Sequence, residues 1–291
     1  MIDLGRPYRV WHPMVMWNIH SVMFEIAWCV MLYTTVLTFE FLPIVLERFG
    51  LDRVRHLLHH VNTPLVILGV LLSTLHQSSL GSLYLIVPEK LHPLWYTPLL
   101  PVLFYISAIG AGLGMIIVES HLSGRAFGRE LEMDLLEPIG RAMVVMLAVY
   151  GVLRIETLIH AGAWRLALGS GYEARMFQTE FGLGVLLPIL LLAWTRIRTS
   201  PTGLVAGASL AVLGFIMNRL DVSVTGLEHS SGTRYSPSWM EVTVSVGLVA
   251  IGFAVFALAV RYLPIFPSHA IPAAAVEGVE DEGATAAAVV G

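Results

Sequence analysis

The stretch SVMFEIAWCVMLYTTVLTFEFLPIVL, residues 21–46, decides the fold class because it is a nearly unbroken apolar run. A spanning helix needs about 20 mostly apolar residues to cross roughly 30 Å of hydrocarbon. A search outward from this run, between charged or proline-rich breaks, gives seven expected spans: Ser21–Leu46, Val61–Leu80, Pro98–Val118, Ile139–Leu158, Gly182–Trp194, Gly203–Met217 and Val242–Tyr262. Barrel strands would alternate over about ten residues instead. The sequence therefore predicts an all-α, polytopic transmembrane helical bundle.

Composition supports a lipid environment and excludes several classes of function. Of the 291 residues, 56% are hydrophobic and only 13% are charged, far from the balance of a soluble domain. Lys90 is the single lysine among 17 basic residues and the net charge is −4, so nothing indicates nucleic-acid binding. The single cysteine, Cys29, excludes a Cys-ligated cluster or a Cys-rich zinc site within this sequence. Any such cluster must belong to a partner.

The chain divides into three expected parts. Residues 1–20 form a polar, proline-bearing N-terminal segment without the apolar core of a secretory signal, residues 21–262 form the transmembrane domain, and residues 263–291 form a disordered Ala/Gly/Glu-rich tail. Arginines in the 47–60 loop favour a cytoplasmic C-terminus and an N-terminus outside. We expect a multi-pass protein of the bacterial inner membrane.

Two polar side chains stand inside the first two spans. A charged group near the membrane centre costs about 2.5–3.5 kcal/mol, so each is a candidate functional residue. Glu25 lies about one turn inside the first span, and His76 lies at a similar depth in the antiparallel second span, at the start of HQSSLGS (76–82). A carboxyl group and an imidazole can hydrogen-bond the carbonyls of a quinone and exchange protons with it. Glu25, His76 and Gln77 are therefore predicted to bind quinone, although helix capping or bridging would also explain them.

Other polar residues are open to more than one reading. Glu119 ends the third span at the opposite face, where it could take up protons for the quinone site or simply cap a helix at the interface. For Arg154 and Glu156 we favour a structural role, with Arg154 snorkelling or pairing between helices. Asn218, Arg219 and Asp221 are read as an interfacial turn at the end of the sixth span.

Two rival classes can be compared with the quinone hypothesis. A b-type cytochrome needs paired axial histidines, and His20 with His76 is the only plausible pair, with His20 at the very edge of its span. A transporter would show an internal repeat and broken helices at the membrane midplane, and no convincing repeat is visible. We therefore expect no haem and no metal in this chain.

Two segments carry a resemblance to a known family. NIHSVMFEIAWCVMLYTTVLTFEF (18–41) and HHVNTPLVILGVLLSTLHQSSLGSLYLIVPEKLHPLWYTPLLPVLFYISAIGAG (59–112) resemble the NrfD/polysulfide-reductase membrane subunits, and most of all the HybB-type subunits of [NiFe] hydrogenases. The resemblance extends to about Tyr262 and is specific, because STLHQSSLGS followed by KLHPLW is not a generic apolar pattern.

The resemblance implies a function and partners. Such subunits are haem-free and pass electrons between a periplasmic iron–sulfur protein and a quinone, menaquinone or ubiquinone, with possible coupling to proton transfer. They are not catalytic alone but belong to complexes such as a hydrogenase:quinone oxidoreductase, whose catalytic subunits would be further partners. The family's quinone and proton positions match Glu25, His76 and Glu119 here. Subunits of this type carry about three more spans, roughly a hundred residues, ahead of this region, so we expect a C-terminal fragment of a longer subunit.

Overall fold

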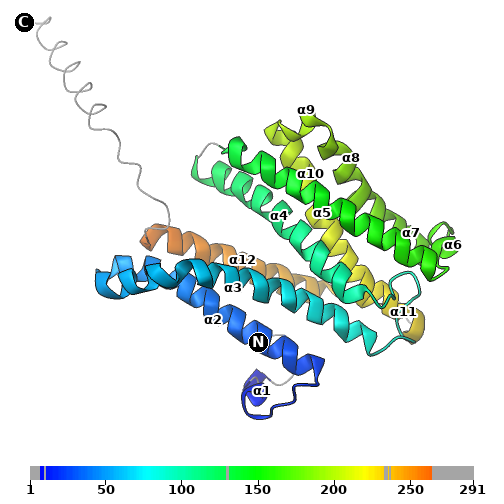
Figure 1. The fold of residues 1–291 in the computed structure, drawn as a ribbon, viewed down its shortest axis with the longest axis horizontal. Helices are drawn as coiled ribbons and strands as arrows, with labels where there is room; N and C mark the ends of the chain where they lie inside the picture. The colour runs from blue at the N-terminus through cyan, green and yellow to red at the C-terminus, as the bar shows by residue number, and fades with distance from the viewer. Residues whose placement is uncertain (1–6, 10, 129–130, 233–234, 236, 264–291) are drawn as a thin grey trace, which may run out of the picture. The chain divides into compact units, whose positions relative to one another are not determined.

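The chain is all-helical in the computed structural model, which describes residues 7–9, 11–128, 131–232, 235 and 237–263 (Figure 1). Within this portion there is no strand. The elements are η1 Pro7–Arg9, α1 His12–Val15, α2 Val22–Arg48, α3 Asp52–Leu85, α4 Leu100–Phe127, α5 Met133–His160, α6 Trp164–Ala167, α7 Tyr172–Phe181, η2 Gly182–Leu186, α8 Leu187–Ala193, α9 Thr195–Arg198, α10 Pro201–Leu220, η3 Asp221–Thr225, α11 Gly226–Ser231 and α12 Trp239–Tyr262. Of the expected C-terminal tail, residues 264–291 lie outside the described residues.

The seven expected spans are confirmed. Helices long and apolar enough to cross a membrane cover Val22–Arg48, Val61–Leu85, Leu100–Ala126, Met133–His160, Tyr172–Ala193, Pro201–Glu228 and Trp239–Tyr262. The chain is thus a multi-pass membrane protein. The two largest boundary errors are in the fifth span, which begins ten residues before Gly182, and in the sixth, which continues well beyond Met217.

Buried polar residues explain both boundary errors. Glu180 is 1% exposed in the fifth span, and Asn218 and Asp221 are 7% and 4% exposed in the sixth. Because these groups have partners inside the bundle, the helices continue through them, each by way of a π-helical segment (η2 and η3). The reading of Asn218, Arg219 and Asp221 as an interfacial turn is therefore wrong.

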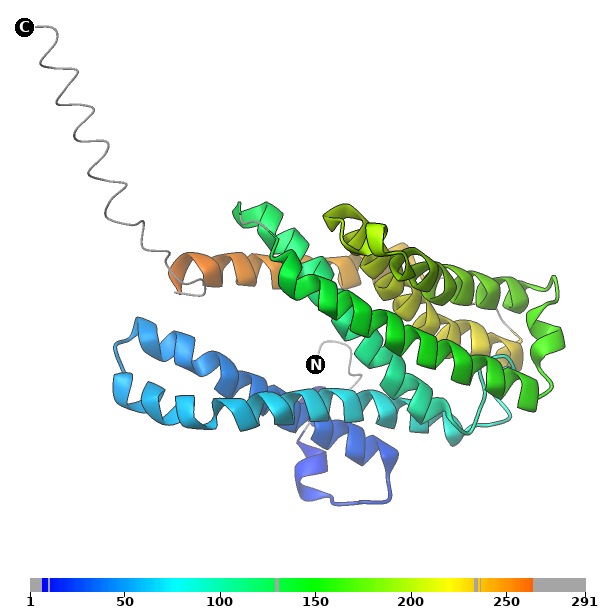
Figure 2. The same cartoon turned by 45° about the horizontal axis from the view of Figure 1, so that its top comes forward.

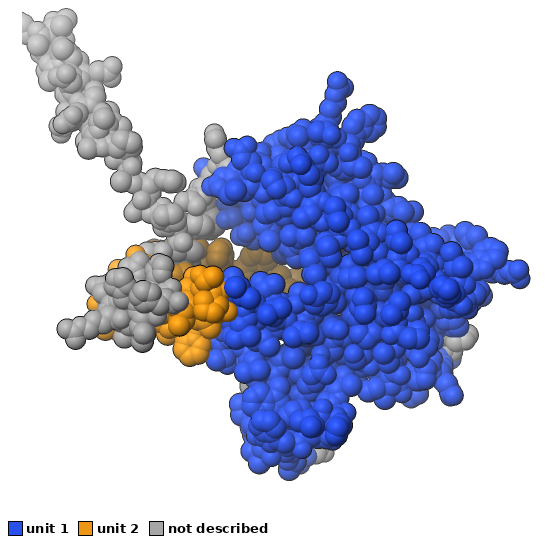
Figure 3. All heavy atoms as spheres, viewed as in Figure 1, with its two compact units in different colours: residues 1–37, 66–236 blue, residues 38–65, 237–291 orange. Residues whose placement is uncertain are grey.

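The described residues form two compact units (Figure 3). Unit 2 comprises 38–65 and 237–291, and it contains the end of α2, the start of α3 and α12. Helix α12 opens on a capping box in which Ser238 Oγ accepts from the Glu241 amide and the Glu241 carboxylate accepts from the Ser238 amide. None of its side chains is buried in the described structure, as suits an apolar helix whose solvent is lipid.

Unit 1 comprises 1–37 and 66–236 and contains a bundle of α4, α5, α7–α8 and α10 (Figures 1 and 2). Helix α4 lies against α5 and α10, and α10 lies against α8. Ile117, Met143, Leu192 and Leu204 fill its core with no exposed surface. Where η2 crosses α10, Gly184 meets Gly214 backbone to backbone, which only residues without a Cβ permit.

The loop between α3 and α4 closes one end of this bundle, which we call the Trp95 end. Trp95 is 0% exposed and its indole nitrogen Nε1 donates to Glu180 Oε2 at 3.0 Å. Arg154, only 2% exposed, donates through Nη2 to the Leu94 carbonyl at 2.8 Å. Irregular backbone at this depth needs such internal partners. The structural role expected for Arg154 is thus observed, by burial and anchoring of the loop rather than by snorkelling.

Candidate functional site

The candidate site begins with a hydrogen bond between the first two spans. Ser79, in the HQSS segment of α3, is 3% exposed, and its hydroxyl Oγ donates to Glu25 Oε1 of α2 at 2.6 Å. Its side chain also lies 3.1 Å from the Leu75 carbonyl one turn earlier. The contact joins residues 54 positions apart and fixes which side of α3 Glu25 approaches.

His76 lies next to that contact. It stands one turn before Ser79, about 60° around the helix axis, and it is partly buried. Its Nδ1 atom is buried and has no hydrogen-bond partner among the described residues. A buried ring nitrogen without a partner is costly unless a ligand or water satisfies it. The Ser79–Glu25 contact and the helical spacing therefore put Glu25 and His76 on the same side of α3.

Gln77 is placed differently from His76. It precedes Ser79 by two positions, which turns it about 160° away around the helix, and it is partly buried. It therefore lies on the side of α3 away from the Ser79–Glu25 contact. If Gln77 takes part in quinone binding, the ligand must extend around α3 to the side on which Gln77 lies.

Aromatic side chains border the Glu25 end of α2. Trp28 Nε1 donates to the Pro13 carbonyl at 3.0 Å and so ties the N-terminal segment to the helix. The Trp17 ring lies 5.7 Å from Phe24 and 5.1 Å from Trp28, measured between ring centroids. Glu25 itself is exposed. The site is thus an open carboxyl group beside an aromatic surface, which a ligand dissolved in lipid can approach.

Glu119 lies far from this site. It is exposed on α4 and near the opposite end of its span from the Trp95 end. Counting helical rises from the two helix starts, Glu25 and Glu119 are separated by about 24 Å along the bundle. A proton cannot pass directly between them over that distance. His121 beside Glu119 also has a buried Nδ1 without a partner in the described structure.

Metal ligation is not indicated by the side chains that the structure describes. Among them no group of three or more His, Cys, Asp and Glu is arranged to hold a metal ion. His20, the possible axial partner of His76 in a cytochrome, is exposed outside α2.

A second polar cluster escaped the sequence reading. Glu180 was not singled out at all, yet it accepts from Trp95 Nε1 and, through Oε1, from Asn218 Nδ2 at 2.6 Å. Arg219 donates to Asn218 Oδ1 at 2.7 Å and to Ser107 Oγ at 3.0 Å. In the sequence, Glu180 directly precedes the fifth apolar run and Asn218 and Arg219 directly follow the sixth. Including these residues in the spans would have predicted longer helices.

Comparison with known proteins gives a consistent result. The family model described as polysulphide reductase, NrfD, matches residues 1–228. A protein of Nitratidesulfovibrio vulgaris is 37% identical over 278 residues, covering 92% of this chain and 71% of its own length. The probable Ni/Fe-hydrogenase 2 b-type cytochrome subunit of Escherichia coli is 33% identical over 91% of this chain and 69% of its own length. The menaquinone reductase integral membrane subunit of Nitratidesulfovibrio vulgaris is 30% identical, with 93% and 71% covered.

Proposed function

The chain belongs to the polysulphide reductase NrfD family, and we propose that it passes electrons between an iron–sulfur partner protein and the quinone pool. It is a membrane subunit of a respiratory oxidoreductase, and relatives bear the names of hydrogenase and menaquinone reductase subunits. A periplasm-facing hydrogenase is the catalytic partner that we propose. The quinone is menaquinone or ubiquinone.

The contact that carries this proposal is the Ser79–Glu25 hydrogen bond beside His76. It holds a carboxyl group next to an imidazole whose Nδ1 is buried and unpartnered in the described structure. Both groups can donate or accept a hydrogen bond and a proton. Glu25 is exposed, which suits a substrate that diffuses within the bilayer.

These residues fit a quinone site. A quinone takes up two electrons and two protons when it is reduced, and it supplies carbonyl oxygens for hydrogen bonds. His76 would hold one carbonyl through an imidazole nitrogen, and Glu25, oriented by Ser79 at 2.6 Å, would exchange a proton at its carboxyl oxygen. Gln77 would contribute a polar group from the side of α3 that faces away from the Ser79–Glu25 contact.

Protons and electrons must reach this site from elsewhere. Glu119 is the proposed point of proton uptake, and the separation of about 24 Å from Glu25 requires intermediate carriers. The chain has one cysteine, so a Cys-ligated cluster that delivers electrons must be held by the partner. The chain then acts as a conduit within a complex and does not carry out the partner's catalysis.

The test is quinone-linked turnover of the purified complex with His76→Ala. Loss of quinone reduction, while electron transfer to a soluble dye continues, would support the site. The matched control is His160→Ala, because the His160 side chain is 79% exposed at the end of α5. Equal quinone turnover in wild type and His76→Ala would refute the assignment of His76.

An optical spectrum of the same samples tests the second candidate function. One relative is named a b-type cytochrome subunit, so a haem-binding role has a specific observation behind it. A reduced haem b band that disappears in His76→Ala would make this chain a cytochrome and overturn the proposal. A complex that contains quinone and shows no haem b band would support it.

A further inference from the structure

The polar cluster inside unit 1 is almost completely withdrawn from solvent. Glu180, Asn218 and Asp221 are 1%, 7% and 4% exposed. Glu180 lies about 12 Å, and Arg219 about 14 Å, from the Trp95 end of their spans when helical rises are counted. The cluster is therefore well inside the hydrocarbon thickness, where each ionised group is expensive unless it has a partner.

The hydrogen bonds in the cluster are incomplete in a specific way. A continuous series of hydrogen bonds links Trp95, Glu180, Asn218 and Arg219. Asp221 Oδ1 accepts from Thr225 at 2.9 Å, but Asp221 Oδ2 and Arg219 Nε are buried without partners among the described residues. A buried carboxylate oxygen is normally satisfied by a donor such as water or a bound proton, and a buried N–H group by an acceptor such as water.

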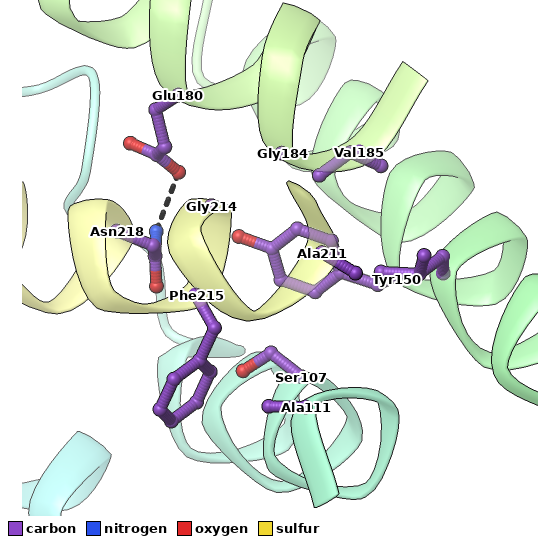
Figure 4. A pocket seen from close by; sticks show the side chains of 11 residues that line it. Ser107, Ala111, Tyr150, Glu180, Gly184, Val185, Ala211, Gly214, Phe215 and Asn218 are labelled. Atoms are coloured by element: carbon purple, nitrogen blue, oxygen red, sulfur yellow. Dashed lines mark hydrogen bonds between the residues drawn. The ribbon is translucent and has the colours of Figure 1, made fainter. Parts of the chain in front are cut away.

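A cavity adjoins the cluster (Figure 4). Its wall is formed by α4, α5, α7, η2 and α10 and includes Ser107, Tyr150, Glu180, Ala211 and Asn218. Figure 4 shows the Tyr150 hydroxyl turned toward Asn218 and Glu180 from across the cavity. The space open to the centre of a water molecule is ≈ 20 Å³, enough for about one water and far too little for a quinone ring.

Asp221 lies one turn after Asn218 on α10–η3, and Asn218 donates to Glu180 Oε1 at 2.6 Å, so two buried carboxyl groups belong to one cluster. Two carboxylates in one low-dielectric site repel each other unless a proton or a cation intervenes. Arg219 supplies one cation. Its guanidinium carbon Cζ lies 3.6 Å from the centroid of the Phe104 ring and 4.3 Å from that of the Phe215 ring. A proton shared within the pair would relieve the remaining repulsion.

We propose that Glu180 and Asp221 form a proton-binding site in the interior of the bundle, with the cavity supplying the water through which the proton arrives. A proton leaves a hydronium ion in the cavity and forms an O–H bond on a carboxylate oxygen of the pair, and the reverse step returns it to water. No electron moves in either step. The part this site plays in turnover rests on the proposed function, whereas the site itself does not.

The decisive variant is Asp221→Asn. Asparagine keeps an oxygen for the Thr225 hydroxyl but removes one carboxyl group from the pair. The experiment records infrared spectra of the purified full complex in lipid nanodiscs across a pH titration, in H₂O and in D₂O. We expect a protonated-carboxyl band that depends on pH, shifts in D₂O, and is lost in Asp221→Asn.

Two further variants separate this site from a purely structural cluster. Ala211→Val adds two methyl groups to the cavity wall without touching an acid, and we expect it to slow the D₂O shift of the band. Glu156→Gln changes an acid with a side chain that is 53% exposed on α5, and it should leave the band unchanged. A band that survives Asp221→Asn, or no such band in the wild type, would overturn the proposal.

Quinone turnover measured on the same samples keeps the two proposals apart. A wild-type complex without quinone turnover that still loses the band in Asp221→Asn would refute the proposed function and support the proton site. A complex with normal quinone turnover and no band dependent on Asp221 would refute the proton site alone.

Discussion

Ser79→Ala removes the hydroxyl that donates from α3 to Glu25 Oε1. Hydrogen bonds between membrane helices average ~0.6 kcal/mol and reach ~1.7 kcal/mol. The 2.6 Å distance and the 3% exposure of Ser79 place this bond in the upper part of that range. If the bond orients Glu25 for proton exchange, its loss should lower the kcat/KM of quinone reduction by about seven- to sixteenfold, since ~1.4 kcal/mol corresponds to a factor of ten.

The assay is quinone reduction by the purified complex, with reduction of a soluble dye as the measure of intact electron input. Ser78→Ala is the matched control, because its side chain points about 100° away from that of Ser79. A double-mutant cycle with Glu25→Ala, read from thermal unfolding, isolates the pair. Equal effects of Ser78→Ala and Ser79→Ala, or a Ser79→Ala effect that is unchanged when Glu25 is already alanine, would refute the reasoning.

Two further substitutions test the packing of unit 1. Gly184→Ala should destabilise the complex by about 1–3 kcal/mol because a Cβ would collide with the backbone of Gly214. The control Gly112→Ala should not destabilise it, since no atom lies within 4 Å of an added Cβ. Thermal unfolding of both variants measures the difference, and equal midpoints would contradict this prediction. Trp95→Phe should cost about 1–3 kcal/mol because it leaves a buried carboxylate oxygen without its 3.0 Å donor, and Trp194→Phe, at 68% exposed, serves as the control whose midpoint should not move.

The spans and the first site were accessible to sequence reasoning because they depend on local patterns. A run of about 20 apolar residues is long enough to cross a bilayer wherever it packs. Glu25 and His76 interrupt such runs at matching depths, so the cost of burying charge singled them out. The contribution of Ser79 was not evident, because a serine in a span is ordinary, and only the packing of α2 on α3 shows which of two adjacent serines meets Glu25.

The second cluster could not be predicted for the opposite reason. Glu180 stands in YEARMFQTEF (172–181), a stretch too polar to be recognised as the start of a span. Its partners Trp95 and Asn218 lie 85 and 38 positions away in the sequence. Whether a polar residue can remain inside a membrane helix is decided by such distant partners, and the same uncertainty displaced the ends of the fifth and sixth spans.

The two sites of unit 1 differ in the access that their surroundings allow, and this difference bears on how the proposed reactions divide. Glu25 is exposed beside His76, so a bulky substrate from the lipid can reach it. Glu180 is buried against Trp95 and lines a cavity of ≈ 20 Å³. A cavity of this size can hold a water molecule that carries a proton, but it is too small for the quinone. We expect redox chemistry at the open surface and proton storage in the closed interior to be coupled through charge. An electrostatic response of the Glu180–Asp221 pair to the redox state of the quinone is the form that coupling would take in this bundle.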